Sequence, residues 1–104
     1  MPVNNSMFDD ESSSLTKERV DEPKMYKVIL HNDNYTTMDF VVKVLVVVFH
    51  FTEPDANKIM MDVHKKGRGI CGVFTKDIAA TKTRQVMDMA EAEEFPLRCS
   101  YEEA

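Results

Sequence analysis

The side chains of this sequence that could do chemistry gather at three places: a polar loop, the start of a helix and one face of a second helix. The loop is the Asn-Asp-Asn run at residues 32–34, the first helix begins near Thr36 and Met38, and the second helix carries Met60, Val63 and His64. The positions on the second helix are spaced i, i+3 and i+4, so their side chains emerge on one side. That side offers two apolar groups and one imidazole, which suits a ligand with a polar head and an apolar body.

A free α-amino group is a ligand that fits this set. Its reference pKa is near 8, so at neutral pH it is largely an ammonium with three N–H donors and no acceptor. Asn32, Asp33 and His64 supply an amide oxygen, a carboxylate and an imidazole nitrogen as acceptors. Each charge-assisted hydrogen bond of this type is worth about 1.5–3 kcal/mol before desolvation.

Simpler explanations exist for the same residues. An Asn-Asp-Asn loop often forms turn hydrogen bonds to its own backbone. A histidine on an apolar helical face is often a core residue, and methionines at helical spacing often pack inside. The residue types and their spacing alone leave both explanations open.

Local patterns predict the elements that would position these side chains. Residues 25–30 are apolar and partly β-branched, which favours a strand. Thr36 is predicted to cap a helix that includes the apolar run of residues 38–51, with Asp39 at the third position after the cap. The six valines of this run would also suit a strand, but its length and its cap favour a helix.

A second helix is predicted to begin at the cap Thr52, with Pro54 and Asp55 in its first turn, and to stop at Gly67. Its apolar positions at helical spacing are Ala56, Ile59, Met60 and Val63.

Residues 69–74 are predicted to form a second strand. Thr75 is predicted to cap a third helix, and residues 97–101 follow Pro96 as a last strand. The third helix is expected to share one buried side among Ile78, Ala79, Val86, Met89 and Ala90. The fold class is therefore α+β, with a small antiparallel three-stranded sheet packed against three helices in the order β-α-α-β-α-β.

Length and charge narrow the class of protein. The 104 residues suit one domain, and the net charge of −5 disfavours nucleic-acid binding. Residues 1–24 carry six acidic against three basic residues, so they hold −3 of that charge. We expect a flexible N-terminal extension over residues 1–24 and a folded domain over residues 25–104.

The sequence lacks the patterns of a membrane span, a secretory signal and a zinc site. It has no apolar run of about 18 residues and no apolar signal core, so we expect neither a membrane span nor secretion but a cytoplasmic location. Cys71 and Cys99 fit no zinc-ligand spacing and are expected to be reduced, half-buried thiols. We expect no cofactor and no metal, and a monomer is the default.

Four segments resemble the ClpS family, the adaptors of the N-degron pathway. They are residues 25–41 (MYKVILHNDNYTTMDFV), 59–64 (IMMDVH), 69–75 (GICGVFT) and the pair Pro96-Leu97. The segments occur in order at matching spacings, and the resemblance covers residues 24–104. It implies an adaptor that binds proteins whose first residue is Leu, Phe, Tyr or Trp. It also implies delivery of these proteins to the Hsp100 unfoldase ClpA, or ClpC, for degradation by ClpP.

The resemblance also implies roles for individual residues. The α-amino group would be held by Asn32, Asp33, Asn34 and His64, in part through water. The side-chain pocket would be lined by Thr36, Met38, Val41, Met60, Val63 and Leu97, with Met38 as the gate against β-branched first residues. The unfoldase contact would involve Tyr26, Asp77 and Lys82, and the extension would take part in delivery.

Two positions depart from the family pattern. Many members have aspartate where this chain has Asn34, which removes a negative charge and predicts weaker or altered binding. Many members have proline where this chain has Thr37, which should be tolerated at small cost. One alternative is a module that docks on the unfoldase without reading amino-termini. An enzyme would need His64 with Asp33 or a cysteine, but the sequence shows no nucleophile elbow, metal-ligand spacing or phosphate-binding glycine loop.

Overall fold

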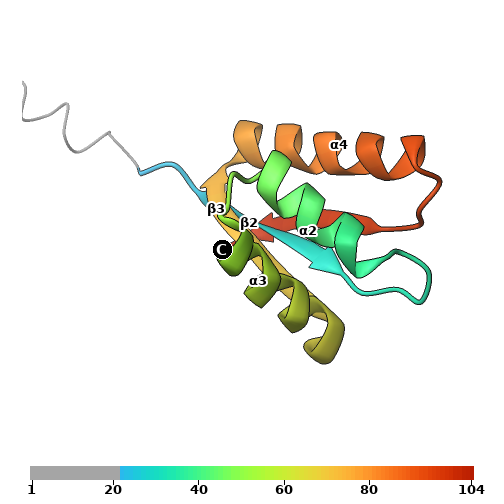
Figure 1. Cartoon of the computed structure of the whole chain (residues 1–104). Helices are drawn as coiled ribbons and strands as arrows, with labels where there is room; N and C mark the ends of the chain where they lie inside the picture. The colour runs from blue at the N-terminus through green and yellow to red at the C-terminus, as the bar shows by residue number, and fades with distance from the viewer. Residues whose placement is uncertain (1–21) are drawn as a thin grey trace, which may run out of the picture.

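The structure, a computed structural model, describes residues 22–104; most of the predicted extension, residues 1–24, lies outside these described residues. The elements in chain order are β2 (Met25–His31), α2 (Met38–Val47), α3 (Glu53–Lys66), β3 (Arg68–Thr75), α4 (Lys76–Ala92) and β4 (Arg98–Glu103) (Figure 1). The predicted α+β fold and its order of strands and helices are confirmed.

The sheet places the first strand in the middle. Its order is β3-β2-β4, and both neighbours run antiparallel to β2. Three consecutive residues of β2, Val28, Ile29 and Leu30, are fully buried. A strand that is buried on both faces shows a continuous apolar run, so the MYKVIL stretch marks the central strand of the sheet.

A β-bulge interrupts the pairing of β2 with β3. Val28 lies opposite Gly72 and Ile29 lies opposite Ile70, so Cys71 is the extra residue of β3. Cys71 is buried in the core, whereas Ile70 and Val73 are both exposed. The bulge therefore places two apolar residues that are three apart in sequence on the same outer side of the sheet.

Two of the helices, α3 and α4, pack against the sheet, and the third packs against α3. α3 packs against β3, α4 packs against all three strands, and α2 packs against α3 (Figure 1). The core between them contains Val28, Leu30, Phe40, Val41, Val44, Leu45, Val48, Ala56, Met60, Val63, Cys71, Ala79, Val86, Ala90, Leu97 and Cys99.

The start of α2 corrects one prediction. The capping residue is Thr37, whose hydroxyl oxygen accepts a hydrogen bond from the Phe40 backbone N–H at 3.1 Å. Thr36, the predicted cap, instead donates its hydroxyl to Asp33. Because neighbouring threonines have the same capping propensity, only the hydrogen bond made by the preceding loop decides between them.

The helix α2 is also shorter than predicted. It ends at Val47 rather than at residue 51, and His50 has a φ of 64° in the turn that follows. The apolar run continues to Phe51 because these turn residues pack against the core, not because the helix continues. In α3 the predicted signals are confirmed: Thr52 caps the helix, and Gly67 ends it with a left-handed φ of 91°.

One residue of α4 was wrongly predicted to be buried. Ile78 is 48% exposed, whereas Ala79, Val86 and Ala90 are buried and Met89 is half-buried. Consecutive helical residues point about 100° apart, so a narrow stripe that includes Ala79 leaves Ile78 outside it. The predicted cap Thr75 does stand at the N-cap position, but its side chain makes no capping hydrogen bond.

Candidate functional site

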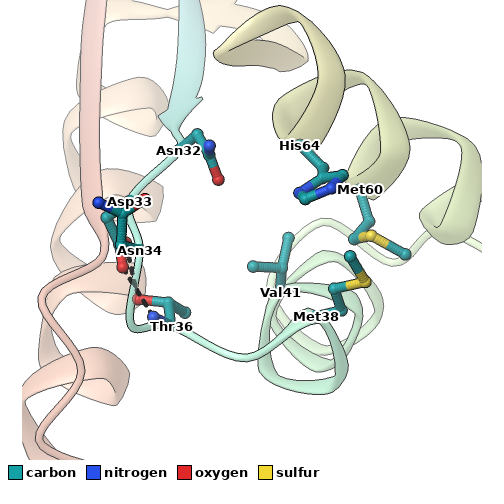
Figure 2. A pocket seen from close by; sticks show the side chains of 8 residues that line it. All are labelled: Asn32, Asp33, Asn34, Thr36, Met38, Val41, Met60 and His64. Carbon is teal, nitrogen blue, oxygen red and sulfur yellow. Dashed lines mark hydrogen bonds between the residues drawn. The ribbon is translucent and has the colours of Figure 1, made fainter.

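A half-open cavity lies where the loop after β2, the start of α2 and one face of α3 meet. Its volume is about 240 Å³. It is lined by Asn32, Asp33, Asn34, Thr36, Met38, Val41, Met60 and His64 (Figure 2). All eight are site residues that the sequence analysis predicts, so the fold brings the three predicted places together.

Asp33 organises the loop that forms the polar side of the cavity. Its Oδ1 accepts hydrogen bonds from the backbone N–H groups of Tyr35 at 2.8 Å and Thr36 at 2.7 Å. Its Oδ2 accepts the Thr36 hydroxyl at 2.7 Å. Burial alone would raise the pKa of this carboxyl, but the hydrogen bonds from Thr36 and Tyr35 outweigh burial and lower the pKa. Asp33 is therefore a fixed negative charge at the cavity.

A backbone link holds the loop against α3. The Asn32 N–H donates to the Gly67 carbonyl at 2.9 Å, directly after the end of α3. β3 approaches the same helix closely, since a Cβ added at Gly69 would lie 2.7 Å from a methyl group of Val63. These contacts fix the position of α3, and hence of His64, relative to the polar loop.

The cavity has a polar side and an apolar side. The Asn32 amide extends from the loop toward the His64 ring, and Met38, Val41 and Met60 gather beside that ring (Figure 2). Val41 and Met60 are buried, whereas His64 is exposed and Met38 is 45% exposed. A ligand can therefore enter from solvent and reach an apolar floor while its polar end stays near Asn32 and His64.

Two predicted pocket residues do not line this cavity. Val63 is 3% exposed and packs in the core, where its side chain occupies the space that a Cβ at Gly69 would need. Leu97 is 2% exposed and borders a separate groove between the end of α4 and β4. Met60 and Val63 share one side of α3, but residues three apart differ in direction by about 60°, so Val63 turns toward β3 while Met60 reaches the cavity.

The three residues assigned to the unfoldase contact lie away from the cavity. Tyr26 is half-buried near the start of β2, with its ring edge-on to Tyr101 at 6.0 Å. Asp77 is exposed in the first turn of α4. Lys82 Nζ donates to the Val48 carbonyl at 2.8 Å beyond the end of α2, so it holds two helices together.

The remaining reactive side chains are not at the cavity. Cys71 and Cys99 are free thiols, both more buried than predicted. Burial raises the pKa of Cys71, and it raises that of Cys99 to about 11 although the Thr83 hydroxyl opposes this shift. Both thiols therefore stay protonated at neutral pH. Within residues 22–104 no cluster of His, Cys, Asp or Glu could hold a metal ion, and no helix is long and apolar enough to cross a membrane.

A small α+β domain with a half-open cavity, polar on one side and apolar on the other, is an architecture suited to a binding protein. Comparison with known proteins then gives its family. The sequence model of the family described as "ATP-dependent Clp protease adaptor protein ClpS" matches residues 21–100. The chain belongs to the ClpS family, and it is an adaptor of the Clp protease rather than a protease itself.

Relatives match over most of the chain. The ClpS adapter of Syntrophus aciditrophicus is 56% identical over 96 residues, covering 92% of this chain and 90% of the relative. The ClpS adapter of Acetivibrio thermocellus is 62% identical over 76 residues, covering 73% of this chain and 77% of the relative. A solved structure, Agrobacterium tumefaciens ClpS2 bound to L-phenylalaninamide, is 38% identical with a TM-score of 0.78. It covers 80% of this chain and 100% of that chain.

Proposed function

We propose that the cavity binds the free amino-terminus of proteins whose first residue is Leu, Phe, Tyr or Trp. The adaptor would deliver these proteins to the unfoldase ClpA or ClpC for degradation by ClpP. The observation that carries the proposal is the pairing, in one cavity, of Asn32 and His64 with the apolar side chains Met38, Val41 and Met60.

The size of the cavity supports a ligand of one residue. Sites for drug-sized molecules usually enclose roughly 300–1,000 Å³. At about 240 Å³ the cavity is smaller than these and suits a single large side chain with its amino group. The A. tumefaciens relative was solved with L-phenylalaninamide, an amino acid derivative of this size.

The charges support a cationic head group. The Asn32 amide oxygen and a neutral His64 nitrogen are acceptors for ammonium N–H groups. Three hydrogen bonds already occupy the Asp33 carboxylate, so it contributes its negative charge and at most one further acceptor site. Asp33 thus attracts the ammonium and holds the loop, while Asn32 and His64 are free to bind it directly.

The position of Met38 supports its proposed role as a gate. It stands at the first position of α2, at the apolar side of the cavity, and is nearly half exposed. Val and Ile carry their bulk at Cβ, close to the backbone of the ligand, where a methionine wall leaves little room. Leu and the aromatic residues branch farther out, so their side chains pass this wall before they widen.

The test is a titration of fluorescent peptides that differ only in their first residue or in its amino group. Peptides that begin with Phe and Leu are expected to bind, and one that begins with Val is expected to bind at least tenfold more weakly. An acetylated Phe peptide has no ammonium and should not bind measurably. Equal binding of the free and acetylated Phe peptides would contradict the proposal and favour a module that docks on the unfoldase without reading amino-termini.

A further inference from the structure

The sheet has an outer face that points away from the core. Val28 and Leu30 of β2 belong to the core cluster, whereas Ile29 between them is fully buried but outside that cluster, so Ile29 points to the opposite side. Strand pairing extends this side to both neighbouring strands. We define the outer face as Lys27, Ile29 and His31 of β2, Arg68, Ile70 and Val73 of β3, and Arg98, Ser100 and Glu102 of β4.

The outer face is positively charged on an acidic protein. Its cations are Lys27, Arg68 and Arg98, and its one carboxylate is Glu102. Glu102 is shared by Lys27 and Arg68, each at 3.5 Å, and Arg98 forms no ion pair with any carboxylate in residues 22–104. Three cations against one anion leave the face at +2, although the chain as a whole carries −5.

The outer face also presents apolar side chains to solvent. Ile70 is 51% exposed and Val73 is 49% exposed, and both lie on β3. α3 and α4 pack against the sheet from the core side, and within the described part of the chain no helix covers Ile70 or Val73. Apolar side chains ringed by unbalanced positive charge are the composition of a surface that binds an acidic, partly apolar segment.

The chain supplies such a segment itself. Residues 1–21 carry five acidic and two basic residues, a net charge of −3, and include the apolar side chains Phe8, Leu15 and Val20. Residues 22–24 join them to β2, the central strand of this face. An extended stretch of 21 residues spans up to about 70 Å, and β2 is only about 20 Å long, so the segment can reach every residue of the face.

We propose that residues 8–21 dock on the outer face of their own chain. In this arrangement the carboxylates approach Lys27, Arg68 and Arg98, and the apolar side chains cover Ile70 and Val73. The docked segment lies on the side of the sheet opposite the helices. Added salt releases it, because exposed charges are screened over about 10 Å at 0.1 M ionic strength.

His31 gives a direct readout of docking. Its Nε2 is hydrogen-bonded to the Ser100 hydroxyl at 2.7 Å within the outer face. Burial lowers the pKa of His31 first, Arg98 and Arg68 lower it further, and Glu102 raises it. A docked acidic segment opposes the two arginines, so it raises the His31 pKa relative to an empty face.

The experiment compares three full-length chains by NMR. The first is the native chain, and the second carries Asp9→Asn, Asp10→Asn and Glu11→Gln in the segment. The third, a matched control, carries Asp39→Asn, Glu53→Gln and Asp88→Asn, which remove the same charge from exposed positions of the three helices. The segment variant is expected to lower the His31 pKa by several tenths of a unit and to shift the methyl signals of Ile70 and Val73. The control is expected to leave both unchanged.

Two results would overturn the proposal. Identical His31 titrations and methyl signals in the native chain and the segment variant would show that the outer face is empty. A difference that disappears on tenfold dilution would show that the segment of a second copy, rather than of the same chain, occupies the face. Well-dispersed amide signals in all three chains check that the domain stays folded.

Discussion

Asp33 shows how a single residue can satisfy two explanations of a sequence motif. The Asn-Asp-Asn loop predicted both turn hydrogen bonds and a ligand site, and the structure contains the turn bonds within the wall of a cavity. The residue types of the site could be predicted from the sequence. The separate roles of Asn32, Asp33 and His64 could not be predicted, because they depend on which oxygens of the Asp33 carboxylate accept hydrogen bonds from Tyr35 and Thr36.

The hydrogen bonds of Asp33 make stability depend on pH in a defined direction. The pKa of Asp33 is lowered by folding, so the unfolded chain binds its proton more readily. The stabilisation is therefore complete above the unfolded value near 3.9 and is lost as pH falls through the lower folded pKa. We expect Asp33→Asn to reduce the free energy of unfolding by about 1 kcal/mol at pH 7. Urea titrations should show this difference shrinking below about pH 4.

A control and a contrary result define that test. Asp88→Asn removes an exposed carboxylate of α4 that forms no ion pair in residues 22–104, so its effect should be small at every pH. A constant difference between the native chain and Asp33→Asn from pH 7 to pH 2 would contradict the assigned hydrogen bonds.

Asn34 leaves the polar loop with a single negative charge, that of Asp33. It is exposed at the cavity, where an aspartate would add a second carboxylate beside Asp33. Asn34→Asp should tighten binding of a Phe-initiated peptide several-fold, because one added charge near an ammonium gains about 1 kcal/mol in a highly solvated site. The gain should decrease with added salt. Fluorescence anisotropy measures the affinity for the peptide, and Asn57→Asp on the exposed side of α3 is the charge-matched control. An equal gain in affinity in both variants would contradict a local effect of the charge at residue 34.

Helices and strands were more predictable than their ends. Thr52 and Gly67 were correctly predicted as the caps of α3, because neither has an adjacent residue of the same type that could take its place. The predicted cap of α2 was wrong by one residue, because Thr36 and Thr37 are both suitable capping residues. The Thr36 hydroxyl donates to Asp33 instead, so Thr37 caps the helix. The early end of α2 was missed because apolar turn residues continue the helical pattern into the core.

Gly67 is the stop of α3 and also the anchor of the polar loop through its carbonyl. Its φ of 91° is strained for any residue with a Cβ, although a Cβ there meets no atom within 4 Å. Gly67→Ala should therefore lower the free energy of unfolding by about 1–2 kcal/mol through backbone strain alone. Gly67→Asn should cost less, since asparagine tolerates the left-handed region better. Urea unfolding measures both, and equal losses would contradict the strain argument.

Lys82 connects α4 to the end of α2. Its ammonium donates to the Val48 carbonyl and lies 5.7 Å from the Phe49 ring and 5.6 Å from the Phe74 ring. Lys82→Met keeps the hydrocarbon chain but removes the donor, so the free energy of unfolding should fall by about 1 kcal/mol. Lys58→Met on the exposed side of α3 is the control. Thermal unfolding that leaves Lys82→Met as stable as the native chain would contradict this structural role and leave the side chain free for a partner.

At the scale of the whole molecule, β2 separates two regions. Asn32 follows its last residue at the cavity, and Tyr26 lies near its first residue, about 20 Å away at the usual rise per residue. This separation supports a substrate at one end and an unfoldase at the other on the same adaptor. The order β3-β2-β4 was not predictable from periodicity, because the pairing of strands depends on contacts distant in sequence.

The most direct test of the account measures the affinity for a Phe-initiated peptide when the cavity loses one side chain. His64→Ala removes an exposed acceptor, so the domain should stay folded while binding weakens at least tenfold, which corresponds to about 1.4 kcal/mol. Lys65→Ala changes the next residue of α3, which is exposed and does not line the cavity, and should bind like the native chain. A fully folded His64→Ala variant with native affinity would contradict the claim that this cavity holds the amino-terminus.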